Sequence, residues 1–158
     1  EKPDLIVTNS GELSVTILAV RHLPKMDMFG KCDPLVELVL GRHIHATEHQ
    51  SNVLDADFSN QGPFLFPLVD FAQELKGGLS ASIYDWNRTQ GRQLVGEATI
   101  SEEALYNEAN KWRGERVLFK ITQPVRFSGQ QRLGHDKSPT EIEFEFSWQG
   151  KKVKAPRD

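Results

Sequence analysis

Apolar and polar side chains alternate along most of this chain. The clearest case is the segment 140–148, TEIEFEFSW. Its apolar positions fall on every second residue: Ile142, Phe144, Phe146 and Trp148. A period of two places such residues on one face of an extended strand, with the intervening glutamates on the other face. The pattern therefore predicts a strand that buries one face and exposes the other.

Segments of this kind, or short apolar runs bounded by Gly or Pro, recur at short intervals. We predict eight strands, within residues 11–20, 33–41, 42–49, 63–69, 79–86, 93–101, 115–122 and 140–148. Many short strands separated by turn residues are typical of an all-β sandwich. The expected fold class is an eight-stranded antiparallel β-sandwich of Greek-key type.

Two stretches between the strands favour short helices. Residues 101–112 begin with Ser101, a good N-cap, and Glu102 and Glu103 suit the positive end of a first helical turn. Residues 70–78 end in two glycines that can close a second, briefer helix. Residues 123–139 read as a long loop between the last two strands, and loops of that length are often functional or disordered.

Composition limits the classes of function. The chain has 158 residues, the size of one ordinary domain, with 38% hydrophobic and 26% charged residues. No apolar run approaches the roughly 18–20 residues that span a bilayer. A formal net charge of −3 argues against a general nucleic-acid binder, so no nucleic-acid partner is expected. The single cysteine, Cys32, cannot form an internal disulfide and suits a reducing, cytoplasmic compartment.

Catalytic motifs are missing from the sequence. It contains no Gly-x-Ser-x-Gly elbow, no phosphate-binding loop and no His-Glu-x-x-His pattern. Asp33 follows Cys32 directly, and a neighbouring carboxylate disfavours the thiolate that a nucleophile requires. We therefore expect a binding module and not an enzyme.

One short stretch carries unusual chemistry. In residues 25–41, KMDMFGKCDPLVELVLG, Asp27 and Asp33 lie six residues apart in a loop that leads into a strand. Met28 and Phe29 lie between them. An aspartate in a turn often does no more than accept a backbone hydrogen bond. Two of them beside apolar residues could instead form half of a cation site on a membrane-facing tip.

The order of the segments resembles a C2 domain, the lipid- and calcium-binding module of protein kinase C, synaptotagmins and cytosolic phospholipases. The resemblance rests on LAVRHLP, MDMFGKCDPLVEL, TEHQSNVLDADF, LSASIYDWN and LVGEATI, in that order. It covers residues 11–148, and leaves 1–10 as a linker and 149–158 as a basic tail or linker in a larger protein. About ten residues precede the first strand and an extra strand closes the chain, which implies the permuted, second-type topology of phospholipase C and cytosolic phospholipase A2.

The resemblance implies a calcium site. The family's first-loop carboxylates fall on Asp27 and Asp33. Its three third-loop aspartates fall on Asp85, Asn87 and Gln93, so three of five carboxylates remain. Calcium takes six to eight oxygens, and its affinity follows the charge around it. Asn52 could add an oxygen from the middle loop. The expectation is one weakly held calcium ion, and the alternative is a vestigial site in which the aspartates only form turns.

The resemblance also implies contacts with lipid. Met28 and Phe29 match the first-loop tip, and Trp86 matches a membrane-inserting position of the third loop, although Phe29 and Trp86 could instead pack on each other or on the core. The family's basic groove falls on residues 42–49, where Arg42 is the only fixed cation and His43, His45 and His49 are expected on one strand face. Those histidines suit a proton-sensitive lipid patch, a metal pair or plain polar surface. Arg88 in the third loop adds a cation.

Two functions follow as expectations. The first is a C2-type membrane-targeting module that docks a larger protein on the cytosolic face of an anionic phospholipid membrane, as a peripheral protein with weak or vestigial calcium dependence. The second is a calcium-independent protein–protein interaction module that keeps the fold without lipid binding. The apolar residues at the loop tips favour the first, whereas the depleted third loop and the lysine-poor groove favour the second.

Overall fold

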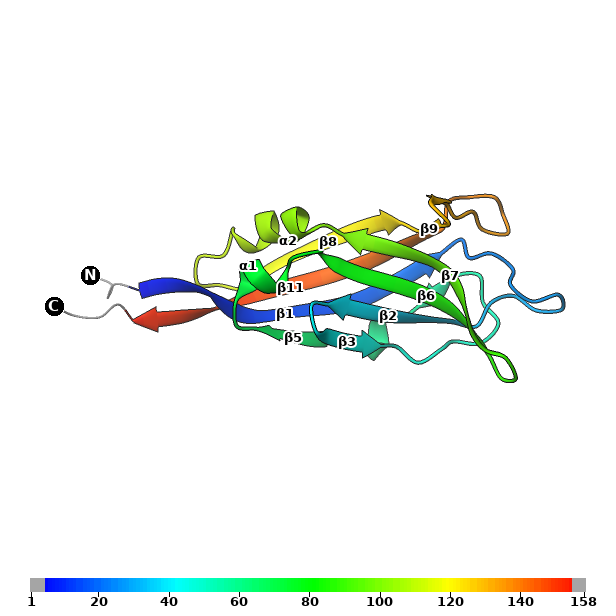
Figure 1. Ribbon diagram of the computed structural model, residues 1–158, viewed down its shortest axis with the longest axis horizontal. Helices are drawn as coiled ribbons and strands as arrows, with labels where there is room; N and C mark the ends of the chain where they lie inside the picture. The colour runs from blue at the N-terminus through cyan, green and yellow to red at the C-terminus, as the bar shows by residue number, and fades with distance from the viewer. Residues whose placement is uncertain (1–4, 155–158) are drawn as a thin grey trace.

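Two antiparallel sheets pack face to face in the computed structural model, which describes residues 5–154 (Figure 1). One sheet contains β1 (Leu5–Arg21), β4 (Ala56–Asp57), β5 (Phe64–Leu68), β8 (Val117–Pro124) and β11 (Glu141–Lys154). The other contains β2 (Pro34–Leu40), β3 (His43–Ala46), β6 (Leu79–Asn87), β7 (Gly91–Ile100), β9 (Arg126–Phe127) and β10 (Gln130–Gln131). Eight of these strands have four or more residues. The predicted eight-stranded β-sandwich is therefore confirmed.

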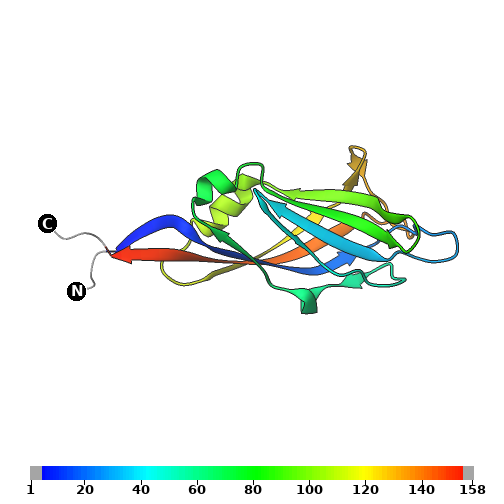
Figure 2. The ribbon, with the colours of Figure 1, turned by 60° about the horizontal axis from the view of Figure 1, so that its bottom comes forward.

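The first and last strands are neighbours in the middle of their sheet. β1 pairs with β5 and β4 on one side and with β11 on the other, and β11 in turn pairs with β8. This order is the permuted topology that the closing strand predicted. The pairing runs from Leu5 opposite Lys154 to Arg21 opposite Glu141. It therefore continues into the segments expected to be a linker and a tail, as a two-stranded ribbon toward the termini (Figure 2).

The core follows the alternation of the sequence. Ile142, Phe144, Phe146 and Trp148 are all buried on one face of β11. Along β2 every second residue is buried as well. Phe146 stacks on Phe119 of β8 with ring centroids 4.9 Å apart, and such aromatic pairs add stability beyond the area they bury.

Both short helices form where they were expected. In α2 (Glu102–Ala109) the Ala104 N–H donates to Ser101 Oγ at 3.1 Å, which caps the first turn. α1 (Phe71–Glu74) begins after Asp70, whose carboxylate accepts the Gln73 N–H. A side chain at Gly78 would lie 2.1 Å from the carbonyl oxygen of Ile100, so only glycine fits that turn. A 3-10 turn, η1, covers Ser59–Gln61.

The expected long loop of residues 123–139 contains regular structure. β9 and β10 form a small hairpin there, and β9 joins the edge of the second sheet through Arg126 opposite Glu97 of β7. Each of these strands has only two residues, too few to show a period in the sequence.

Four connections meet at the end of the sandwich opposite the termini (Figure 1). We name them loop 1 (22–33, β1 to β2), loop 2 (47–55, β3 to β4), loop 3 (88–90, β6 to β7) and the late loop (125–140, β8 to β11). Backbone hydrogen bonds join loop 1 to loop 2 and to the late loop, with Leu23 N–H donating to the Leu54 carbonyl and His135 N–H to the Leu23 carbonyl. The side chains gathered at this end therefore come from distant parts of the sequence.

The burial of Phe146 predicts a large effect on stability. We expect Phe146→Ala to lower the free energy of unfolding by about 3–5 kcal/mol, because it removes a buried ring and leaves a cavity. Leu118→Ala is the matched control, since Leu118 lies on the outer face of β8 and is 71% exposed; its effect should stay within about 0.5 kcal/mol. Chemical denaturation of both variants measures this, and equal losses would contradict the assigned faces of the strands.

Candidate functional site

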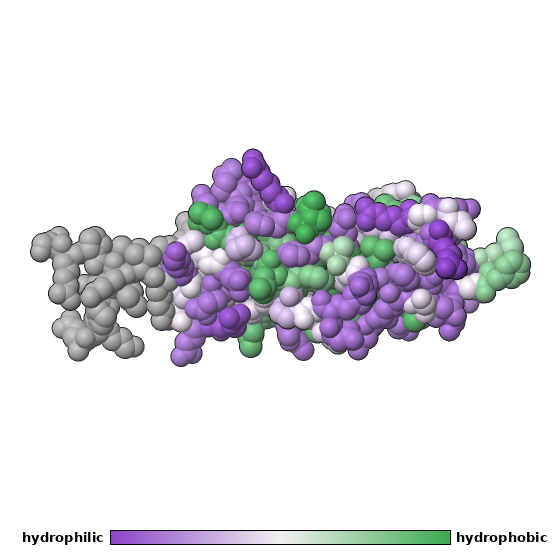
Figure 3. Space-filling view, turned by 90° about the horizontal axis from the view of Figure 1, so that it is seen from below, coloured by the Kyte–Doolittle hydropathy of each residue, from purple (hydrophilic) through white to green (hydrophobic). Residues whose placement is uncertain are grey.

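Loop 1 projects two apolar side chains into solvent. The Met26 N–H donates to the Lys31 carbonyl at 3.0 Å and closes the base of the loop. Beyond that closure Met28 is 84% exposed and Phe29 is 97% exposed. Hydrophobic atoms protrude at this end of the molecule in Figure 3, opposite the grey termini. Neither side chain packs on the core, so the alternative that Phe29 is buried is wrong.

Asn52 fastens loop 2 to loop 1. Its Oδ1 accepts the Lys31 N–H at 2.8 Å, and its own N–H donates to Asp33 Oδ1 at 2.6 Å. Asn52 adopts a φ of +57°, in the left-handed region that asparagine tolerates better than most residues. Between these two contacts the backbones of Cys32 and Val53 form an isolated antiparallel β-bridge. The side chain expected to supply a calcium ligand thus already holds the two loops together.

Asp85 is the carboxylate at the centre of this end. It is 1% exposed, and its Oδ1 accepts the Asp33 N–H at 2.7 Å. Burial raises the pKa of Asp85, and the negative charges of Asp27 and Asp33 act in the same direction, while the hydrogen bond from Asp33 opposes them. The three aspartates named by the resemblance therefore lie close enough to repel one another.

The thiol of Cys32 lies against the same carboxylates. Burial raises the pKa of Cys32 far above its usual range, and the charge of Asp85 adds to the shift. The thiol therefore stays protonated at physiological pH and cannot act as a nucleophile.

Asn87 and Gln93, the two other positions that the resemblance assigned to the third loop, add no charge to this group of carboxylates. The Oδ1 of Asn87 accepts hydrogen bonds from Thr89 N–H, Thr89 Oγ1 and Gln90 N–H, and so holds the turn of loop 3. Gln93 is exposed on β7 directly opposite Asp85. Arg88 is exposed at the tip of the same turn.

The donor set matches calcium in chemistry but offers few free oxygens. In the part of the chain that the structure describes, no three His, Cys, Asp or Glu side chains are placed to hold a metal ion. One oxygen each of Asp33, Asp85, Asn52 and Asn87 already accepts backbone N–H groups. Carboxylate and amide oxygens are what calcium prefers, and six to eight are needed. The residues fit a partly assembled calcium site that would need backbone carbonyls or water to complete it.

Trp86 packs on loop 2 and remains partly exposed, so its expected insertion into a membrane stays a prediction. Its ring stacks on His49 of loop 2 with centroids 4.1 Å apart and planes 8° from parallel, and the side chain remains 36% exposed. β3 ends at Ala46, so the expectation that His49 shares a strand face with His43 and His45 is wrong. His49 instead joins loop 2 to the end of β6, directly before loop 3.

His43 and His45 do share one face of β3, and they face β5. The Nε2 of His45 donates to the Leu65 carbonyl at 2.9 Å while its ring packs against Phe64 and Phe66. The Nε2 of His43 lies 3.4 Å from Glu74 Oε1. Arg42 is in the β2–β3 turn at the opposite end of β2 from loop 1 (Figure 1). The residues of the expected lipid groove are therefore separate from the loop 1 tip.

Sequence reasoning missed how the late loop meets loop 1. Arg132 places its guanidinium 4.7 Å from the ring centre of Phe127 and its Nη2 3.3 Å from the sulfur of Met26. The Ser128–Gly129 pair, a common turn dipeptide, was the one sequence signal for this hairpin.

Comparison with known proteins agrees with this geometry. The model of the C2 domain family matches residues 11–114. Synaptotagmin-5 of Mus musculus is 28% identical over 119 residues, which are 72% of this chain and 30% of that protein, and synaptotagmin-B of Diplobatis ommata is 28% identical over 66% of this chain and 24% of its own length. The chain thus spans less than a third of either relative.

Solved structures share the fold at low identity. A C2 domain of plant extended synaptotagmin 1 superposes with a TM-score of 0.66 at 19% identity, covering 96% of this chain and 98% of that one. Human GIVD cytosolic phospholipase A2 gives 0.61 at 20% identity, over 92% of this chain and 17% of the phospholipase. With the two-sheet topology and a family match over most of its length, this chain belongs to the C2 domain family.

Proposed function

We propose that this domain brings a larger protein to the surface of an anionic phospholipid membrane by inserting the tip of loop 1. The observation that carries the proposal is the exposure of Met28 and Phe29 at the apex of the loop, in front of a carboxylate cluster. Full burial of such a side chain contributes roughly 1.5–3 kcal/mol. The two α-helices of the described residues have four and eight residues, far short of the roughly 20 that cross a bilayer. We propose that the attachment is peripheral and on the cytosolic face.

Calcium is proposed to assist weakly. Asp27, Asp33 and Asp85 would hold one ion, with Asn52 or Asn87 able to contribute only if their present hydrogen bonds are exchanged. Burial is the main cause of the raised pKa of Asp85, and a cation there would relieve the repulsion by Asp27 and Asp33 that adds to it. Neutralising the cluster would also remove negative charge from the end that faces an anionic surface.

A protein-interaction module is the second candidate. The groove expected on β3 favours this candidate, because His43 is engaged with Glu74 of α1 and His45 with Leu65 of β5. The fixed cation of that groove, Arg42, lies at the opposite end of β2 from loop 1. We propose a non-catalytic role in either case, because the buried thiol is inert and the phospholipase neighbour shares only 17% of its chain with this fold.

The first test concerns the loop 1 tip. Met28→Ala combined with Phe29→Ala should weaken binding to phosphatidylserine-containing vesicles at least about tenfold at both low and physiological salt, because apolar burial is not screened by ions. Vesicle sedimentation measures this, with Leu118→Ala as the control of similar exposure away from the loops. Unchanged binding of the double variant would refute insertion of this loop, and absence of binding by the parent would favour the interaction module.

The second test separates charge from apolar burial. Arg88→Gln should weaken vesicle binding about fivefold at low ionic strength and much less at physiological salt, since a cation near an anionic surface contributes about 1 kcal/mol and salt screens it. Lys76→Gln is the control, because Lys76 is exposed beside α1, away from the four loops. An effect of Arg88→Gln that does not depend on salt would argue against an electrostatic role.

The third test concerns calcium and the pKa of Asp85. The pKa of Asp85 is higher in the folded state than in the unfolded state, where it is about 3.9. The protonated carboxyl therefore contributes to stability fully below the unfolded pKa, and this contribution is lost as pH rises through the folded pKa. Asp85→Asn keeps the oxygen that accepts the Asp33 N–H and removes the charge. We expect it to raise the melting temperature at pH 7 without calcium, and to reduce the increase that calcium gives the parent.

Glu115→Gln serves as the control for this test, since Glu115 is exposed and none of the ion pairs among the described residues includes it. It should leave both melting temperatures unchanged. If calcium does not shift the melting temperature of the parent and calorimetry records no heat, the site is vestigial.

A further inference from the structure

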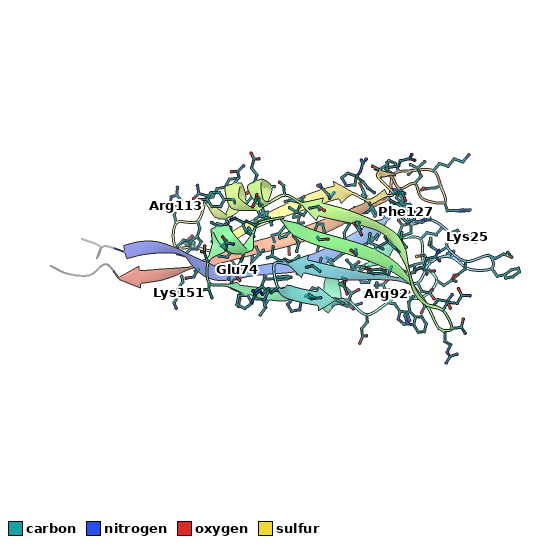
Figure 4. All side chains as sticks on the ribbon, in the orientation of Figure 1. Lys25, Glu74, Arg92, Arg113, Phe127 and Lys151 are labelled. Atoms are coloured by element: carbon teal, nitrogen blue, oxygen red, sulfur yellow. The ribbon has the colours of Figure 1, made fainter. Side chains whose placement is uncertain are left out.

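The late loop lies beside loop 1 at the end of the molecule proposed to meet the membrane. Figure 1 places the late loop at the same end as loop 1, Figure 2 shows its hairpin projecting from the side of the sandwich near that end, and Phe127 and Lys25 are both labelled at this end in Figure 4. The proposed function assigns it no part.

Several contacts fix the late loop to the start of loop 1. The His22 Nδ1 lies 2.8 Å from Asp136 Oδ2, and Thr140 Oγ1 donates to the His22 carbonyl at 2.6 Å. The His135 N–H donates to the Leu23 carbonyl at 3.1 Å. A side chain at Gly134 would lie 2.2 Å from the His22 carbonyl oxygen, so the two backbones touch. The position of the late loop relative to loop 1 is therefore set by the fold.

The late loop is also ordered internally. The Arg132 N–H donates to the Val125 carbonyl at 2.8 Å, and the Thr140 N–H donates to the Arg132 carbonyl at 2.9 Å. The Gln131 Nε2 reaches the carbonyls of Val125 and Arg132 at 2.9 and 3.0 Å. Side chains on this segment consequently hold fixed directions.

Its surface combines apolar and cationic groups. Leu133 is 50% exposed and Phe127 is 37% exposed, although both belong to residue types that are usually buried. Arg126, Arg132 and Lys137 take part in none of the ion pairs within the described part of the chain. The Nε of Arg132 is buried without a hydrogen-bond partner among those residues.

The local carboxylates do not offset these cations. Asp136 accepts a hydrogen bond from the Ser138 N–H and pairs with His22. Both contacts lower the pKa of Asp136, and the Ser138 hydrogen bond has the larger effect. Glu97 lies across the β7–β9 pair from Arg126, whose guanidinium instead donates to the Gly129 carbonyl. Positive charge therefore exceeds negative charge on the late loop.

We propose that the late loop is a second contact with the anionic bilayer, in which Phe127 and Leu133 enter the interface while Arg132 and Lys137 meet lipid headgroups. This inference rests on the proposed membrane function. A bilayer presents anionic groups above an apolar interior, and exposed apolar side chains beside uncompensated cations match both layers. The contact lies at the same end as loop 1, so both can touch one surface at once.

The direct test is to label the late loop at one introduced cysteine, which is feasible because the native Cys32 is buried. A cysteine introduced by Ser128→Cys at the exposed hairpin tip can therefore be labelled selectively with a polarity-sensitive dye. Its emission should shift to the blue with phosphatidylcholine–phosphatidylserine vesicles. The same dye on Lys76→Cys, away from the loops, should not shift. No shift at the hairpin in the presence of bound vesicles would overturn the proposal.

Binding measurements give an independent test. Phe127→Ala with Leu133→Ala should weaken vesicle binding about tenfold at every salt concentration, whereas Lys137→Gln should weaken it about fivefold at low salt only. Leu118→Ala and Lys76→Gln are the matched controls. Melting temperatures show whether each variant is folded. If the double variant Phe127→Ala with Leu133→Ala does not fold, the labelled Ser128→Cys protein serves as the test of the late-loop contact.

The outcomes separate the two proposals. If the parent binds vesicles and needs Met28 and Phe29, but the late-loop variants bind as the parent does, this inference fails and the proposed function stands. If the parent does not bind, the proposed function fails. A loss confined to a protein partner, with vesicle binding unchanged, would assign the late loop to an interaction surface instead.

Discussion

The pairing of the first strand with the last determines how this domain is arranged. β1 and β11 pair from Leu5 opposite Lys154 to Arg21 opposite Glu141, so residues from the two ends of the chain form the centre of one sheet. Closing so long a loop costs conformational entropy, and the buried aromatic side chains of β11 offset it. The same pairing sends both ends of the described chain to one pole of the sandwich. The four loops that carry the site are therefore gathered at the other pole (Figure 1).

The carboxylates at that pole follow from the pairing of β2 with β6. Pro34 lies opposite Asp85 in that ladder, so the end of loop 1 and the start of loop 3 must meet. Burial of Asp85 makes its charge unfavourable, and Asp27 and Asp33 add to this because a low-dielectric setting strengthens their repulsion. Asn52 and the backbone of Asp33 limit the movement of these groups by hydrogen bonds. The fold thus holds the three carboxylates close together, and a cation bound among them would lower their mutual repulsion.

The sequence predicted those elements that show a periodic alternation of apolar residues or a helix N-cap residue. The alternation of residues 140–148 identified β11 and its buried face, and Ser101 identified the start of α2. The aspartates at 27, 33 and 85 could be grouped only through resemblance to a family, because no local pattern reports a contact between residues so far apart in the chain. The stacking of His49 on Trp86 could not be predicted, since it depends on where β3 ends. Two-residue strands such as β9 and β10 leave no periodic signal, so the late loop read as irregular.

If loop 1 and the late loop both touch a bilayer, as proposed, the two contacts restrict the orientation of the domain more than one contact does. A single inserted tip leaves the domain free to tilt and rotate about it, whereas a second contact fixed in the same rigid fold removes most of that freedom. Loop 1 and the late loop are joined through the backbones of His22, Leu23 and Gly134, so ordering one on the membrane costs little additional entropy for the other. With these loops at one pole and Leu5 and Lys154 at the other, such an arrangement would point both ends of the described chain away from the membrane surface. The cations of the late loop would then add attraction to an anionic surface, which the proposed calcium site, with three of the five carboxylates of the family pattern, would supply only weakly.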